Sequence, residues 1–268
     1  MNLPLFIYRK LKTNTDKSNI SSRIIKIAIF SVFVGIFVSL SAVSIGKGLQ
    51  VSIKEKLFNI SSDISISSYE NNNRGIASEI IQELEGIKGE IKTLYPDIII
   101  NSILEKPSIV TIDNSIETVI FRGVKNELNF KKFDQFILEK LNDSPNSLND
   151  IIISKSLLEK LNISIGDNIT LYFQTFDNQK IPNIRYYRVY GVYETDFPDF
   201  DSSYIIGSIE SLQNLYKLNS NDVGAIELII IDKESVMDIN NKLSAQDLFL
   251  NNNLSIVTVQ DKYSNIFN

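Results

Sequence analysis

The stretch IAIFSVFVGIFVSLSAVSIG, residues 27–46, contains no charged side chain, although 22% of the residues in the whole chain are charged. An α-helix rises about 1.5 Å per residue, so such a run reaches roughly 30 Å, the thickness of a bilayer's hydrocarbon core. Its serines are compatible with lipid, because a serine hydroxyl can donate to the backbone carbonyl one turn earlier. The stretch therefore predicts a transmembrane helix.

Two other interpretations compete with a retained span. A buried core helix is usually shorter or carries a polar stripe. A cleaved secretory signal would need a small-x-small site, which Ala42-Val43-Ser44 supplies. The long, polar leader of 26 residues, and an apolar stretch longer than the usual core of a signal, favour a retained span.

The charge on either side of the run predicts its orientation. Residues 1–26 hold six basic side chains and one acidic one, a net charge of +5, while the whole chain is at −5 and the remainder therefore at −10. Basic leaders stay in the cytoplasm, so we expect the N-terminus inside and an acidic domain outside the membrane. Excess negative charge repels phosphate, so we expect no nucleic acid partner.

Composition limits the chemistry that the chain can perform. Histidine and cysteine are both absent, which removes the commonest general base and every Ser-His or Cys-His nucleophile. The acidic run 194–201 lacks the spacing of a calcium loop and is predicted to be a solvated turn. The basic and aromatic residues of 185–193 alternate as in a half-exposed strand, which we prefer to a single-stranded nucleic acid surface. We expect no catalytic residue, no cofactor and no metal site.

Apolar residues recur every four positions beyond Gly46, at Leu49, Ile53 and Leu57, which predicts a stalk helix over residues 47–58. Residues 59–268 mix short strands and helices, so the predicted fold class is α+β. The predicted helices are 76–87, 130–141, 209–216, 233–244 and a short one within 150–173. The predicted strands are 62–68, 94–103, 107–113, 117–124, two within 150–173, 185–194, 202–207, 224–231 and 254–259. Of these, 107–113 and 117–124 are expected to form a hairpin.

Two segments carry a family resemblance, IIISKSLLEKLNISIGDNITL at 151–171 and YRVYGVYETDFPDFDSSYIIGSIESLQNLY at 187–216. With the leader and span before them, they resemble the permease subunits of one ABC transporter superfamily. It includes lipoprotein-releasing (LolC/LolE), macrolide-exporter (MacB) and division (FtsX) types, and the segments look most similar to the first. The resemblance implies a MacB-like extracytoplasmic core domain of two subdomains.

This resemblance implies a non-catalytic transport subunit in the bacterial inner membrane. Its expected partners are an ABC ATPase subunit, a second permease subunit, membrane lipid, a lipoprotein cargo and a periplasmic carrier. The implied organisation is a cytoplasmic leader (1–26), a span (27–46), a stalk (47–58) and the core domain (59–268). Such permeases have four spans, so we expect this chain to be the N-terminal part of one, unable to transport in isolation.

In lipoprotein-releasing permeases a loop of the outer domain can hook the periplasmic carrier. The matching position here is the polar loop between two predicted strands at 175–184. Its candidate carrier-contact residues are Thr175, Phe176, Asp177, Asn178, Gln179, Lys180, Ile181 and Pro182.

Two alternative functions remain open. One is a MacB-type export permease for small or peptide substrates. The other is a single-span anchored binding or sensor domain with no role in transport.

Overall fold

The structure is a computed structural model that describes residues 3–13, 20–73, 76–81, 84–112, 115–125, 133–142, 148–174, 182–230, 235–246 and 253–264. The chain divides into two compact units, Met1–Ile53 and Lys54–Asn268.

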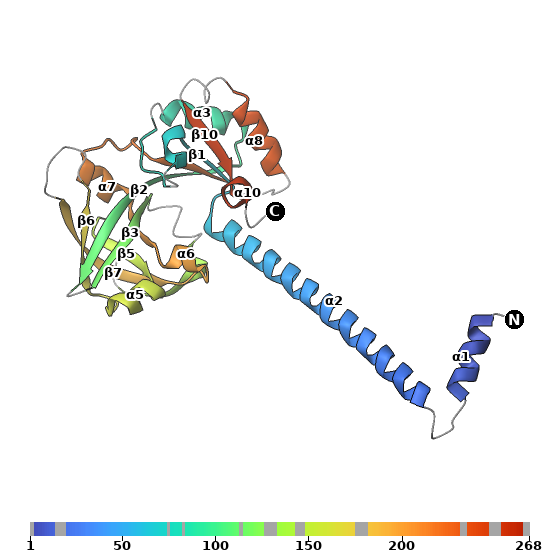
Figure 1. The fold of residues 1–268 in the computed structure, drawn as a ribbon. Helices are drawn as coiled ribbons and strands as arrows, with labels where there is room; N and C mark the ends of the chain where they lie inside the picture. Colours follow the sequence, from blue (N-terminus) through green and yellow to red (C-terminus); the bar gives the residue numbers. More distant parts are fainter. Residues whose placement is uncertain are drawn as a thin grey trace. The chain divides into compact units, whose positions relative to one another are not determined.

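The first unit is helical (Figure 1). It contains α1 (Leu3–Thr13) and most of α2 (Ile20–Ile60), a helix of 41 residues that includes the predicted span and the predicted stalk. Within Arg23–Lys54, the most apolar window has a mean hydropathy of 2.4, and none of it is buried. The hydroxyls of Ser31 and Ser39 each donate to a carbonyl four residues earlier at 2.9 Å. By length and composition, α2 is able to cross a membrane.

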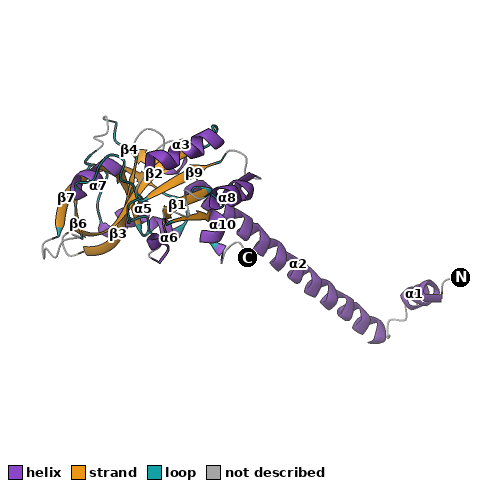
Figure 2. Cartoon of the chain, turned by 90° about the horizontal axis from the view of Figure 1, so that it is seen from above, coloured by secondary structure: helices purple, strands orange, loops and turns teal. Residues whose placement is uncertain are grey.

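The second unit mixes strands and helices, which confirms the predicted α+β class (Figure 2). Its described strands are β1 (Ile64–Ser68), β2 (Ile99–Ile112), β3 (Ser115–Val124), β4 (Ile137–Lys140), β5 (Asp150–Ser154), β6 (Asn168–Phe173), β7 (Asn183–Tyr193), β8 (Tyr204–Ser208), β9 (Ala225–Ile229) and β10 (Leu254–Thr258). Its described helices are η1 (Tyr69–Asn73), α3 (Leu84–Leu94), η2 (Asp134–Phe136), α5 (Lys155–Leu161), α6 (Pro198–Asp201), α7 (Ile209–Tyr216), α8 (Val236–Ser244) and α10 (Val259–Lys262).

The strands form one continuous sheet that partly closes on itself. Its order is β10-β1-β9-β2-β3-β8-β5-β7-β4, and β6 pairs with both β2 and β7. Strands β2, β3, β8, β5, β7 and β6 therefore make a closed ring. Strands β9, β1 and β10 continue from β2 as an open sheet that lies with α3 and α8 (Figure 1).

Strand β2 belongs to both parts. Along one edge, residues 99–103 pair with β9 and residues 108–111 pair with β6. Along the other edge, β3 pairs from Ile103 to Ile112, as the predicted hairpin requires. The open sheet and the ring thus share one strand, and the edge of β2 between 104 and 107 pairs with neither β9 nor β6.

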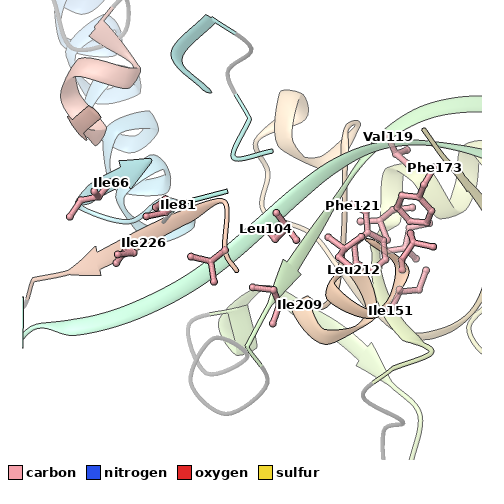
Figure 3. Packing of buried hydrophobic residues seen from close by; sticks show 14 of the residues in the cluster. Ile66, Ile81, Leu104, Val119, Phe121, Ile151, Phe173, Ile209, Leu212 and Ile226 are labelled. Atoms are coloured by element: carbon pink, nitrogen blue, oxygen red, sulfur yellow. The ribbon is translucent and has the colours of Figure 1, made fainter. Parts of the chain in front are cut away.

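Aromatic side chains fill the interior of the closed ring of strands. The ring centroid of Phe121 lies 5.7 Å from that of Phe173 and 5.1 Å from that of Tyr187. Figure 3 shows Phe121 and Phe173 beside Leu212 of α7, while Ile66 and Ile226 pack in the open sheet. A Cβ on Gly207 would come within 2.4 Å of the Phe121 ring, so this strand needs glycine where the aromatic side chain meets it.

The predicted helix over 76–87 is wrong for residues 76–81, while its residues 84–87 are helical. The helix here is α3, Leu84–Leu94, and it runs through Gly86 and Gly89. Residues 76–81 are not helical and instead form backbone contacts to the strands, including a bridge between Ile81 and Val223. Burial of Ile87 and Ile91 on one face of α3 outweighs the cost of glycine on its exposed face.

The predicted helix over 130–141 is also wrong. Its described part consists of η2 followed by strand β4, which pairs antiparallel with β7 across an irregularity in register. The ring of buried Phe133 lies 6.0 Å from that of Tyr193 and 5.9 Å from that of Phe200. The apolar spacing suited a helix, but pairing with the open edge of β7 decided the structure.

The predicted strands 94–103 and 107–113 are wrong as two separate strands, because they form the single strand β2, Ile99–Ile112. The remaining predicted strands and helices of residues 59–268 are present, with ends shifted by a few residues. In β7, buried Tyr187, Val189 and Gly191 alternate with the half-buried Arg188 and Tyr190, which confirms the half-exposed strand predicted there.

Candidate functional site

The predicted carrier-contact loop lies at the tip of the β6–β7 hairpin. The last pair of that hairpin joins Phe173 to Asn183. Residues 175–181 of the predicted loop lie outside the described residues, and Pro182 is exposed immediately before β7. A contact between this loop and a carrier remains a prediction.

The described candidate site is the junction at which the open sheet separates from the ring. Here a short segment that contains Ala77 and Ser78 covers residues 104–107 of β2, the part of its edge that pairs with neither β9 nor β6. The backbone N–H of Glu105 donates to the Ala77 carbonyl at 2.9 Å, and the Ala77 N–H donates to Oε2 of Glu105 at 2.9 Å. Lys106 Nζ donates to the Ser78 carbonyl at 2.6 Å. These bonds satisfy polar groups that the branching of the sheet would otherwise leave buried.

Asn71 and Gly224 also contact the segment that contains Ala77 and Ser78. Oδ1 of Asn71 accepts from the backbone N–H of Ser78 at 3.2 Å and of Glu79 at 2.9 Å. Its Nδ2 donates to the Gly224 carbonyl at 3.3 Å. A Cβ on residue 224 would lie 1.8 Å from the Ala77 carbonyl oxygen, so only glycine fits there.

Three charged side chains meet at the junction. Arg122 of β3 donates from one terminal nitrogen to Glu105 of β2 and from the other to Glu227 of β9, both at 2.5 Å. The side chain of Arg122 is 9% exposed, that of Glu105 is 4% exposed and that of Glu227 is 13% exposed. Burial lowers the pKa of the Arg122 guanidinium, but Glu227 and then Glu105 oppose this effect and the pKa rises overall. We call this set the Glu105–Arg122–Glu227 triad.

Two tyrosines pack beside the triad and keep their protons. Burial raises the pKa of Tyr204, and the carboxylate of Glu105 raises it further. Burial also raises the pKa of Tyr193, whose hydroxyl donates to the Tyr204 carbonyl at 2.8 Å. Phenols with raised pKa values cannot act as bases near neutral pH. The two ion pairs of the triad join strands β2, β3 and β9.

A groove of about 340 Å³ opens over the triad. Its lining residues are Ser65, Ser67, Asn71, Ile76, Ala77, Ile103, Glu105, Arg122, Glu227, Val257 and Lys262. The described part of the chain contains no group of three carboxylates able to hold a metal ion.

The end of α2 is fixed to the same sheet through Asp63. The Asp63 N–H donates to the Leu228 carbonyl at 3.0 Å, and its carboxylate accepts from the N–H of Ile230 at 2.7 Å. The Val259 N–H donates to the Asp63 carbonyl at 3.1 Å, and α10 begins there with a capping box of Thr258 and Asp261. The chain thus enters the sheet on β1 and leaves it on β10, with both ends bonded together.

The prediction of a solvated turn for the acidic run 194–201 is wrong at its last residue. Asp201 is buried at the end of α6 and accepts from the hydroxyl of Thr195 at 2.7 Å. Burial raises the pKa of Asp201, while the bonds from Thr195 oppose that shift. Asp196 is largely exposed and contacts Lys56 at 3.1 Å. Asp201 is buried because the preceding residue, Phe200, packs in the hydrophobic core.

The triad was not predicted from the sequence. Glu105 and Arg122 are 17 residues apart, and Arg122 and Glu227 are 105 apart. Arg122 and Glu227 each lie inside an apolar strand run, and a charge on a buried strand needs a partner. Glu105 gave no such signal, because it falls between the predicted strands 94–103 and 107–113.

A family model described as the MacB-like periplasmic core domain matches residues 27–246. The periplasmic region of MacB from Actinobacillus actinomycetemcomitans is similar at 15% identity and a TM-score of 0.46, over 76% of this chain and 92% of that one. The extracellular domain of the ABC-type transporter YknZ from Gram-positive bacteria is similar at 12% identity and a TM-score of 0.44, over 73% and 99%. Curated protein sequences gave no match.

Proposed function

Because the chain belongs to the family of the MacB-like periplasmic core domain, we propose that it is a permease subunit that releases lipoproteins from the bacterial inner membrane. The family assigns an ABC-transporter permease function and a membrane-anchored extracytoplasmic domain. The match over residues 27–246, which includes the apolar helix as well as the domain, is the observation that carries the proposal. The lipoprotein cargo rests on the resemblance of 151–171 and 187–216 to LolC/LolE-type permeases.

The proposed arrangement follows the charge of the chain. Residues 1–26 lie in the cytoplasm, 27–46 cross the membrane, 47–58 form the stalk and 59–268 form the extracytoplasmic core. A separate ATPase subunit hydrolyses ATP, and a second permease subunit completes the assembly. The chain itself carries out no chemistry and passes motion from the membrane to the cargo.

Depletion of the protein in its own organism tests the cargo. Lipoproteins destined for the outer membrane should then accumulate in the inner membrane. Normal lipoprotein sorting together with increased sensitivity to a macrolide or peptide would instead support the MacB-type export function, which the family description also favours. Unchanged sorting and unchanged sensitivity would support the anchored binding domain.

The stalk is proposed to act as a rigid lever. Helix α2 is continuous from Ile20 to Ile60, and a helix without a hinge transmits displacement along its axis. Insertion of Gly-Gly after Ile53 in the assembled transporter should uncouple ATP hydrolysis from release, because glycine weakens the helix. Insertion of Ala-Ala at the same point is the length-matched control and should retain more coupling. Equal release by both insertions would count against the lever.

The loop 175–182 is proposed to contact a periplasmic carrier. Replacing Lys180 and Ile181 by alanine should abolish site-specific crosslinking from this loop to the carrier. Replacing Lys217, an exposed lysine that follows α7, is a control that should leave crosslinking intact. Crosslinking that persists in the double variant would refute this role.

A further inference from the structure

We propose that the groove over the triad binds a short, uncharged peptide segment through its main-chain amide groups. The groove lies within the second unit and has a volume of about 340 Å³, a size typical of sites for small ligands. The inference goes beyond the proposed function, because it does not depend on which cargo is transported.

The floor of the groove is the polar face of the open sheet. Side chains along a strand alternate between its two faces. On β1, Ile64 and Ile66 belong to the hydrophobic core that also contains residues of α3 and α8, whereas Ser65 and Ser67 line the groove. Figure 3 shows Ile66 beside Ile226 on the core face. Helices α3 and α8 therefore pack against the apolar face, and the polar face forms the groove.

Asn101 places an acceptor without a donor on this polar face. It lies opposite Glu227 in the pairing of β2 with β9, and it alternates in phase with Ile103 and Glu105, which line the groove. Asn101 is 4% exposed, and its Oδ1 has no hydrogen-bond partner among the described residues. A buried polar atom without a partner destabilises a fold, so this position suits a donor that a ligand supplies.

Arg122 places a donor without an acceptor at the same groove. Its terminal nitrogens bind Glu105 and Glu227, whereas its Nε has no partner within the part of the chain that the structure describes. A peptide unit carries one C=O acceptor and one N–H donor, so it offers a partner to Nε and a partner to Oδ1 of Asn101.

The rest of the lining favours an uncharged peptide. The two carboxylates of the triad are balanced by Arg122 and Lys262, so the lining has no net charge. Ile76, Ile103 and Val257 add aliphatic walls that suit small apolar side chains. The described lining includes no aromatic ring on which a sugar could stack. A neutral peptide therefore fits this groove better than a charged ligand or a sugar does.

Equilibrium dialysis of the full chain in detergent micelles tests the proposal. The probe is radiolabelled acetyl-Ala-Val-Ala-amide, and empty micelles correct for partitioning into detergent. Uptake should saturate at about one peptide per chain. Unlabelled acetyl-Ala-Asp-Ala-amide and glucose, at the concentration at which unlabelled probe displaces the label, should leave it bound. Displacement by glucose as effective as that by the probe would overturn the choice of a peptide.

Two variants locate the binding. Ser67→Tyr should abolish saturable uptake, because the phenol ring fills the groove from the sheet floor. Thr118→Tyr, at an exposed position of β3 that does not line the groove, is the matched control and should retain it. Equal uptake by wild type and Ser67→Tyr would overturn the proposal, as would wild-type uptake no greater than that of empty micelles.

Asn101→Leu separates a binding role from a structural one. Leucine has a similar shape, so the variant should weaken peptide binding roughly five- to tenfold, the loss of one hydrogen bond. The midpoint of its urea unfolding without peptide should be unchanged or higher, because a buried unpartnered atom has been removed. A lower midpoint with unchanged binding would assign Asn101 to the fold alone and contradict the proposal. These samples contain neither ATPase nor lipoprotein, so failure here leaves the transport proposal untouched.

Discussion

Replacing Arg122 by methionine should lower the free energy of unfolding of the second unit by about 3–5 kcal/mol at pH 7. The guanidinium joins Glu105 and Glu227, whose side chains are 4% and 13% exposed. Methionine has a similar length and fills much of the space, so packing changes little. The cost arises because two carboxylates then face each other with no positive charge between them.

The experiment measures urea unfolding of the full chain in detergent micelles. Tyrosine fluorescence follows the transition, since the chain has 11 tyrosines and no tryptophan. A matched control removes an exposed pair: Lys140 contacts Asp134 at 2.7 Å with side chains 36% and 50% exposed. Lys140→Met should cost less than about 1 kcal/mol, because solvent screens that pair.

A triple variant provides a second test of the same reasoning. When Arg122→Met is combined with Glu105→Gln and Glu227→Gln, the protein should recover much of the lost stability, because no buried charge remains. A loss that persists in full in the triple variant would refute the electrostatic explanation.

Gly224→Ala should destabilise the second unit by about 2–3 kcal/mol in the same unfolding assay, because its Cβ would lie 1.8 Å from the Ala77 carbonyl oxygen. Gly89→Ala, at an exposed helical position with no atom within 4 Å, should instead stabilise by about 0.5–1 kcal/mol, and loss of stability there would contradict this assignment. Burial, followed by the electrostatic effect of Tyr187, raises the pKa of Tyr216 to about 12. The unfolded chain therefore loses this proton first, and stability should fall as the pH rises from about 10 to about 12; ultraviolet titration that shows Tyr216 ionised by pH 10 would contradict it.

The sequence predicted the elements whose pattern is local. The uncharged run 27–46 and the four-residue spacing after it indicated one long helix, and α2 contains both. The β2–β3 hairpin follows from two β-rich runs beside a polar turn. In each case, neighbours in the chain supply the interactions that form the element.

The errors occur where distant parts of the chain decide the structure. Residues 137–140 form a strand because the edge of β7 is available, which no local spacing reveals. Residues 77–78 cover β2 because the sheet branches there, a consequence of the pairing of β9 and β6. The triad joins three strands that are far apart in the chain. The carrier-contact loop was inferred from resemblance alone, and its residues 175–181 lie outside the described part.

The hydrogen bond between Val259 and Asp63 has a mechanical consequence. β1 and β10 run antiparallel, and their first pair, Ile64 with Thr258, lies where the chain enters and leaves the sheet. A tensile force that separates these two ends would open the ladder one rung at a time, which requires little force. A force that moves both ends together leaves every rung unstrained. The domain is therefore stiff toward concerted displacement of its two ends and compliant when they are drawn apart.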